Sequence, residues 1–322
     1  MNQVSRDQSI CRTTRTMRWR SQAWCLFALM TMVAGCAGGG ADPKDAVVSA
    51  PTVSSDDLLT AAETDIAARR FQLAYQRLAR LDQAALATPR AKLVSAEVLL
   101  GLNSPKEALT QFQSIQSDQA YQARAFQGMG LSLVALDDLA TAQPQLERAV
   151  AADPDLWRSW MALGRIHDAE KNWVESEAAY GKALALQPGS SIVVNNMGMS
   201  LMLQHRYPEA AVTFQRALTS DPSMEMTRAN LRIALAWQGR YDEAMMGARA
   251  AGRADALNNV GYVAMLRGDQ EAAQKYFSQA LENSPTYHER AARNLETLKL
   301  LVRSKTANQT GMAPAGSPPP TE

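Results

Sequence analysis

Apolar residues recur at intervals of three and four along most of the chain, from about Asp56 to Val302. This spacing is typical of amphipathic helices that bury one face. The same region contains no stretch of alternating apolar and polar residues that would indicate a β-strand. Asp-Pro, Gln-Pro and Ser-Pro pairs interrupt the pattern, and such pairs are typical of turns between helices. The pattern therefore predicts an all-α fold made of many short helices.

Small residues and prolines repeat with a fixed period. Three prolines lie 34 residues apart, at Pro154, Pro188 and Pro222. Three glycines keep the same interval, at Gly130, Gly164 and Gly198. A fixed period of this length indicates a stack of similar helical units rather than separate domains, because one unit cannot bury its apolar face alone.

The unit over residues 157–190 carries the most complete motif. Its characteristic residues are Trp160, Leu163, Gly164, Tyr180, Ala183 and Pro188. The motif resembles the tetratricopeptide repeat (TPR), a helix–turn–helix unit whose two helices are called helix A and helix B. The resemblance implies an all-α TPR solenoid of about seven repeats over residues 55–303, closed by a C-terminal capping helix at about residues 288–302.

The small residues of the motif have a packing reason. A glycine or alanine at the eighth position of helix A lets helix B approach closely, and an aromatic residue at the twenty-fourth position, in helix B, fills the space between them. Gly198 and Phe214 hold these two positions in one unit. We therefore expect helices A and B to be closest at these glycines.

The 34-residue register breaks after Pro222. The next glycine and aromatic positions of the motif, Gly261 and Phe277, arrive five residues early. We expect the unit over residues 225–253 to be shortened in its second helix or in the turn after it. Arg232 occupies the place that glycine holds in the other units, so we expect a local distortion there.

The first 35 residues differ in character from the repeats. Five arginines and one aspartate precede an apolar run from Ala23 to Val33. This run has about half of the ~20 residues that a membrane-spanning helix needs. A basic segment, a short apolar segment and small residues together predict a signal peptide over residues 1–35. Met17 is an alternative start of translation, because it opens a basic segment directly before the apolar run.

The motif Val33-Ala34-Gly35-Cys36 resembles the lipobox of bacterial lipoproteins. The resemblance implies that Cys36 carries acyl chains such as palmitate and becomes the first residue after cleavage. The alternative is an ordinary signal peptide that ends beside a cysteine. Two or three acyl chains hold a protein on a bilayer far more firmly than one. Ala37 stands where aspartate would mark inner-membrane retention, which favours an outer-membrane lipoprotein that faces the periplasm.

The segments that flank the repeats have a different composition. Residues 36–54 are rich in glycine, proline, serine and alanine, which predicts a lipidated cysteine followed by a flexible tether. Residues 304–322 include three consecutive prolines and predict a disordered tail.

Charge and cysteine content exclude two further classes. Without its first 35 residues the chain has 28 basic and 31 acidic residues and no basic stripe, so we expect no nucleic-acid partner. Cys11 and Cys25 lie in the segment that we expect to be cleaved, which leaves only Cys36. A single cysteine cannot form an intramolecular disulfide, so packing alone must hold the fold.

The sequence contains no combination of residues that indicates catalysis. The three histidines, His167, His205 and His288, fall in different units without the spacing of metal ligands, and we interpret them as surface or helix-end residues. Phosphate-binding loops, Cys-x-x-Cys, His-Glu-x-x-His and Gly-x-Ser-x-Gly motifs are missing from the sequence. We therefore predict no enzyme activity, cofactor, metal site or small-molecule substrate.

Helix A positions 2, 5, 9 and 12 line the concave surface of TPR proteins, and the resemblance places a methionine-rich strip there. We call this strip the predicted groove, and it comprises Met161, Ile192, Asn195, Met199, Met202, Met226, Ile233, Tyr262 and Met265. Methionine is flexible and polarisable, which suits a surface that adapts to an apolar peptide or an amphipathic helix. The alternative is that these residues are core shared between successive helices A.

A carboxylate clamp of the TPR type is not supported. Such a clamp needs lysine and arginine at matched groove positions, and the helix A segments between Ala123 and Leu266 contain no lysine. Asn196, Asn230 and Asn259 recur at equivalent places, which a repeat consensus explains.

The later half of the chain resembles the TPR lipoproteins of tight-adherence (Tad/Flp) pilus systems. The likeness rests on the segments at residues 195–201, 229–236 and 238–244 and on the shortened unit before Asn258-Asn259-Val260-Gly261. The resemblance implies a pilotin-like protein that binds an outer-membrane secretin subunit and assists its assembly. The alternative is an adaptor that recruits peptidoglycan hydrolases or other envelope assembly factors through the same groove.

Overall fold

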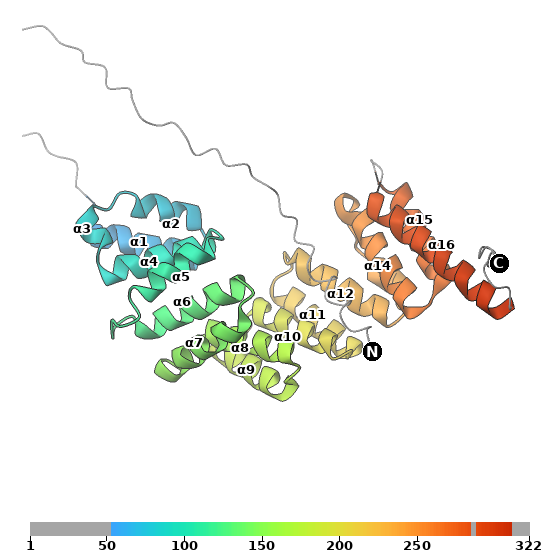
Figure 1. Cartoon of the computed structure of the whole chain (residues 1–322). Coiled ribbons are helices and arrows are strands. Elements are labelled where there is room, and N and C mark those ends of the chain that lie inside the picture. Colours follow the sequence, from blue (N-terminus) through green and yellow to red (C-terminus); the bar gives the residue numbers. More distant parts are fainter. Residues whose placement is uncertain (1–52, 285–287, 311–322) are drawn as a thin grey trace, which may run out of the picture. The chain divides into compact units, whose positions relative to one another are not determined.

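The computed structural model describes residues 53–284 and 288–310, and every regular element within them is a helix (Figure 1). In chain order, these elements are α1 (Ser55–Ala67), α2 (Phe71–Leu78), α3 (Gln83–Leu86), α4 (Pro89–Gly101), α5 (Pro105–Gln113), α6 (Gln122–Ala135), α7 (Leu139–Ala152), α8 (Trp157–Glu170), α9 (Trp173–Leu186), α10 (Ser191–Leu203), α11 (Tyr207–Ser220), α12 (Glu225–Trp237), α13 (Tyr241–Met245), the 3₁₀ turn η2 (Ala250–Gly252), α14 (Arg253–Arg267), α15 (Gln270–Glu282) and α16 (Glu289–Thr310).

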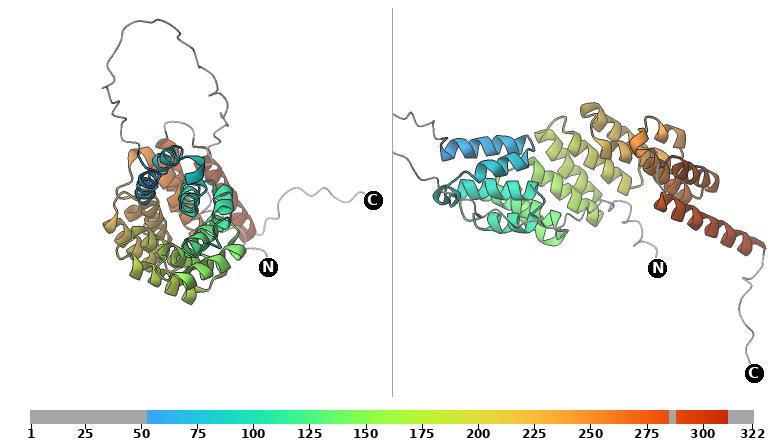
Figure 2. Two further views of the ribbon diagram at one scale, coloured as in Figure 1. Left: turned by 90° about the vertical axis from the view of Figure 1, so that its left-hand side faces the viewer. Right: turned by 90° about the horizontal axis from the view of Figure 1, so that it is seen from above.

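The helices pack in consecutive pairs, and each pair is one helix A and one helix B (Figures 1 and 2). Full pairs are α6 with α7, α8 with α9, α10 with α11, and α14 with α15. Each helix A also contacts the helix B before it and the helices A of neighbouring units. Because every contact joins near neighbours in the sequence, the predicted all-α solenoid of helix–turn–helix units is confirmed.

The turn between helix A and helix B has one residue with a positive φ angle in every unit. These residues are Arg69, Asn103, Asp137, Lys171, His205, Gly239 and Gly268. The first six lie 34 residues apart, whereas Gly268 follows Gly239 by 29 residues. The break in this series confirms the five-residue shortening that the sequence predicted.

The glycines of helix A mark the closest approach between the two helices of a unit. A Cβ atom at Gly198 would lie 2.5 Å from Cε1 of Phe214, and one at Gly164 would lie 2.8 Å from Cε1 of Tyr180. Both contacts are too short for a real side chain, so the helices reach this distance only with glycine. The packing role predicted for the repeated glycines is confirmed.

Proline positions and helix boundaries agree with the predicted register. Pro154, Pro188 and Pro222 all lie in turns between a helix B and the next helix A. The last helix is longer than predicted, because α16 continues to Thr310 rather than ending near Val302. Residues 304–310, which the sequence assigned to a disordered tail, therefore belong to α16. No glycine or proline occurs between residues 288 and 310, so nothing in the backbone stops the helix earlier.

Several predictions fall outside the described residues. The signal peptide, Cys36, nearly all of the tether and the end of the tail are among them. Within residues 53–284 and 288–310, no helix has the length and apolar character needed to cross a membrane.

Candidate partner-binding surface

The predicted groove is spread over α8, α10, α12 and α14, and none of its nine residues is buried. Met161 and Ile192 are half-buried. Met226, in the first turn of α12, is the most open, with 70% of its surface exposed. The strip therefore offers apolar atoms to solvent, which is a property of binding surfaces when such residues are contiguous.

Several members of the predicted groove also contact the core. Met199 and Met202 pack against a buried cluster that includes Ala210 and Phe214. Tyr262 and Met265 pack in the same way against the cluster around Phe277, and Ile233 packs against the cluster around Leu257. One side of each of these side chains packs against the buried core between helices, and the other side remains accessible to solvent.

Asn195 connects two successive helices A. Its Oδ1 accepts a hydrogen bond of 2.9 Å from Oγ1 of Thr227 and one of 3.3 Å from Nδ2 of Asn230. A similar bond of 3.0 Å joins Asn258 to Asn294. The amide of Asn195 is thus already used within the protein, and its role in holding the units together was not predicted from the sequence.

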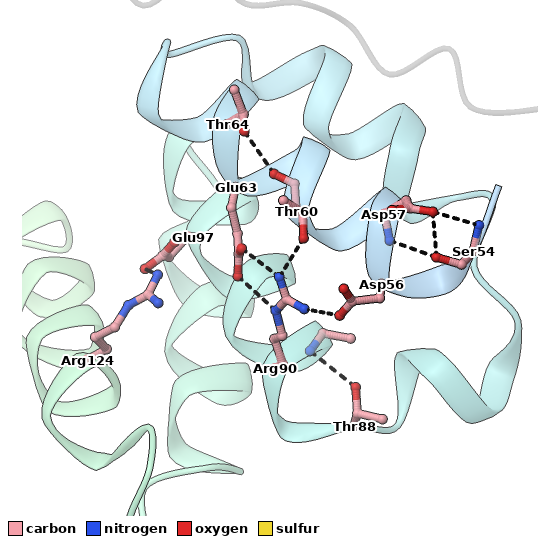
Figure 3. A network of polar contacts seen from close by, with 11 residues as sticks. Ser54, Asp56, Asp57, Thr60, Glu63, Thr64, Thr88, Arg90, Glu97 and Arg124 are labelled. Carbon is pink, nitrogen blue, oxygen red and sulfur yellow. Dashed lines mark hydrogen bonds and ion pairs between the residues drawn. The ribbon is translucent and has the colours of Figure 1, made fainter.

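A network of charged and polar side chains joins the helices α1, α4 and α6 of the first units (Figure 3). Arg90 on α4 reaches α1, where its guanidinium donates to both Glu63 oxygens at 3.1 and 2.8 Å and forms an ion pair with Asp56. Arg124 on α6 pairs with Glu97 on α4 at 2.8 Å. The hydrogen bond and charge of Arg90 lower the pKa of Glu63 against the opposing effect of burial. Sequence reasoning missed this network, although Asp56, Arg90 and Arg124 lie 34 residues apart.

A buried carboxylate lies between the units of α8 and α10. Asp168 accepts hydrogen bonds from Ser176 at 2.5 Å, from Ser200 at 2.6 Å and from Tyr180 at 2.8 Å. Burial and the Asp168 charge raise the pKa of the Tyr180 phenol, so the phenol stays protonated and can donate. This cluster was not predicted, because only the place of Tyr180 in the repeat motif was visible in the sequence.

A pocket opens in the shortened unit, where α12 and α14 meet η2. Its cavity measures about 170 Å³ and its lining includes Arg232, Ile233 and Asn259. This pocket is the local distortion that we expected at Arg232. The helix B of this unit, α13, has five residues, whereas α11 has fourteen, so α13 ends before it can cover this part of α12.

The TPR family matches the chain over residues 128–191 and again over residues 254–287. These two stretches are tetratricopeptide repeats. The first match covers α7, α8 and α9 with most of α6, and it includes the Gly164–Tyr180 pair. The second covers α14 and α15 and includes the Gly261–Phe277 pair. No curated protein matches the chain in sequence.

Several solved structures are similar to the chain at low sequence identity. The APC/C hetero-tetramer Cut9-Hcn1 shares 15% identity, with a TM-score of 0.55 over 80% of this chain and 51% of that one. YrrB, a TPR protein described as having an unusual peptide-binding site, shares 20% identity over 56% of this chain and 96% of its own, with a TM-score of 0.43. A TPR protein from Parabacteroides merdae shares 14% identity over 76% and 98%, with a TM-score of 0.48. The similarity to Cut9-Hcn1 shows a shared fold alone.

The TPR units make the chain a scaffold for protein–protein interaction, since stacked repeats present an extended surface to a partner. Within the described residues, no group of three or more His, Cys, Asp or Glu side chains is placed to hold a metal ion. His205 lies in an A–B turn with its Nδ1 2.7 Å from the Tyr207 hydroxyl, and Nδ1 of His288 accepts from the backbone N–H of Ala291 at the start of α16. His205 is exposed and His288 directly precedes α16, which agrees with the interpretation of these two histidines as surface or helix-end residues.

Proposed function

We propose that this chain is a lipid-anchored TPR scaffold of the outer membrane that faces the periplasm and binds partner proteins through the predicted groove. The observation that carries the binding part is that all nine groove residues keep accessible surface, although they lie on the helices A of four successive units. A strip of half-exposed methionine and isoleucine can adapt to an apolar segment of a partner.

The partner in this proposal is a secretin subunit of a Tad/Flp pilus, which gives the chain the pilotin-like role of the lipoprotein TadD. Support comes from the resemblance in the later half of the chain, where residues 229–236 lie on α12 and the shortened unit precedes Asn258. The lipobox-like motif before Cys36 supports the proposed location at the outer membrane, because acyl chains on a cysteine would hold the scaffold at the membrane where secretins assemble.

Lipidation is tested by Cys36→Ser in the bacterium that encodes the chain. The variant should incorporate no labelled palmitate and should leave the outer-membrane fraction. Cys25→Ser is the matched control, because Cys25 lies inside the apolar run and should not affect labelling. Normal labelling and fractionation of the Cys36→Ser protein would remove the anchor from the proposal.

Partner binding is tested by Met226→Glu in the lipidated full-length chain. A new carboxylate on this exposed position should weaken capture of the secretin subunit, because its burial against an apolar partner segment is unfavourable. Secretin multimers in the outer membrane should decrease in parallel. Secretin assembly that does not depend on the chain, together with specific capture of a peptidoglycan hydrolase, would favour the adaptor role instead.

A further inference from the structure

The pocket of the shortened unit exists because a helix B side chain is missing. In the complete units, the eighth position of helix A is a glycine covered by a large helix B residue, such as Phe214 over Gly198 and Phe277 over Gly261. In the shortened unit that position is Arg232, and α13 ends at Met245. The arginine side chain therefore lines a pocket at a place that is packed core in its neighbours.

Arg232 has no partner for its charge among the described residues. It is half-buried, it forms no hydrogen bond or ion pair, and its Nε is buried without an acceptor. Burial lowers the pKa of the guanidinium, and the Glu225 charge opposes this shift only in part. An unsatisfied buried donor is unfavourable in the free protein, so an acceptor that enters the pocket would gain the interaction that Arg232 lacks.

The two carboxylates at the pocket are already paired with other cations. Glu225 contacts Arg228 at 2.5 Å and Arg249 at 3.1 Å. Asp255 contacts Arg290 at 2.9 Å and His288 at 3.4 Å. The two carboxylates of the lining are thus neutralised by arginines outside it, whereas the charge of Arg232 has no such partner among the described residues, and this unpaired charge favours an acidic occupant.

The size and lining of the pocket limit what can enter. A cavity of about 170 Å³ is smaller than the roughly 300–1,000 Å³ of typical small-molecule sites, so it fits a side chain better than a metabolite. The remaining wall is largely apolar, with Ala229, Ile233, Ala256 and Val260. Such a wall suits the carbon atoms of the occupant and of a neighbouring apolar residue.

We propose that this pocket binds the side chain of an aspartate or glutamate from an apolar segment of the partner protein, with the carboxylate on Arg232. The inference rests on the proposed function only in taking a protein as the occupant. It adds a specificity-determining contact, because a guanidinium and a carboxylate form charge-assisted, directional hydrogen bonds. In the complete units, glycine stands in the place of Arg232, at Gly130, Gly164, Gly198 and Gly261, so this arginine is particular to the shortened unit.

The test is selection of a random twelve-residue peptide library on the full-length chain in detergent. The wild type should enrich peptides with Asp or Glu at one position beside an apolar residue. Arg232→Met, which replaces the unbranched stem of the side chain but supplies no guanidinium, should lose this preference and bind the selected peptides about tenfold more weakly or worse, as expected for a lost charge-assisted bond. Arg232→Lys should keep the acidic preference, and Arg216→Met on the exposed side of α11 is the control for loss of one charge.

Three results for the arginine variants would overturn this inference. They are an unchanged acidic preference in Arg232→Met, the same loss in Arg216→Met, and a clearly lower melting temperature of Arg232→Met, which would make the arginine a structural residue. Failure of the proposed function is a different result: the wild type would then select no peptides at all and capture no secretin. Peptides selected by the wild type without an acidic position would overturn the inference and leave the scaffold role intact.

Discussion

Ser200 on α10 donates a hydrogen bond of 2.6 Å to the buried carboxylate of Asp168 on α8 and so joins two successive TPR units. Ser176 and Tyr180 on α9 donate to the same carboxylate. Three hydroxyl groups satisfy the charge, and no cation pairs with Asp168 among the described residues. A polar contact of this kind fixes the register between units, which apolar packing alone leaves less specific.

Ser200→Ala should destabilise the protein by about 1.5–3 kcal/mol, the usual worth of a hydrogen bond to a charged group. Ser132 on α6 is the matched control, because it occupies the equivalent repeat position and is equally buried, yet its hydroxyl has no partner. Ser132→Ala should be neutral or stabilising. Urea unfolding of both variants measures the difference, and equal effects would show that the Asp168 contact does not stabilise the stack.

Gly198→Ala should destabilise by about 1–3 kcal/mol, because the added Cβ would overlap the Phe214 ring and force the two helices apart. Gly181→Ala on α9 should instead stabilise by about 0.5–1 kcal/mol, since its Cβ meets open space and alanine is the better helix former. Thermal unfolding of the two variants tests the register, and a stable Gly198→Ala protein would contradict it.

Met199→Glu together with Met202→Glu should lower the melting temperature, because both methionines pack against the cluster around Phe214 as well as facing solvent. Met226→Glu should change stability by about 0.5 kcal/mol or less, as exposed substitutions usually do. Circular dichroism melts of the full-length chain compare them. A double variant as stable as the wild type would place these two methionines wholly on the surface.

Arg77→Met should lower the free energy of unfolding at neutral pH, and this destabilisation should disappear in acid. The hydrogen bond from Arg77 is the largest cause that lowers the pKa of the buried Asp65 carboxyl below its usual 3.8, and Arg70 adds to it. A carboxyl with a lowered folded-state pKa contributes stability above its unfolded pKa, and this contribution is lost as the pH falls through the folded value. The difference in unfolding free energy between wild type and variant should therefore be constant from pH 7 to about 5 and shrink below about 4. A difference that does not change down to pH 2 would show that Arg77 acts by packing alone.

Features that repeat along the sequence were predictable from it. Three turns could be predicted from Pro154, Pro188 and Pro222, and one contact between helices from Gly198 and Phe214. This was possible because the same packing of helix A against helix B recurs every 34 residues. The early arrival of Gly261 located the shortened unit for the same reason. The sequence could not decide whether Met199 and Met202 belong to the groove or to the core. In the structure one side of each methionine packs against the core and the other side faces solvent, and a helical period does not distinguish these two sides.

The sequence by itself therefore determined the repeat, its period, its turns and the place of the break, all of which depend on contacts between neighbours in one unit. Only the tertiary structure decided which charges meet. Asp168 is hydrogen-bonded to Ser200, and Arg90 to Glu63, although the residues of each pair lie about one repeat apart in the sequence. Arg232 forms no ion pair with a carboxylate among the described residues, although Glu225 lies two turns away on the same helix. Such pairings depend on side-chain direction and on competing partners such as Arg228 and Arg249. Hydrophobic periodicity carries no information about either, because burial is non-directional whereas hydrogen bonds and ion pairs require a particular geometry.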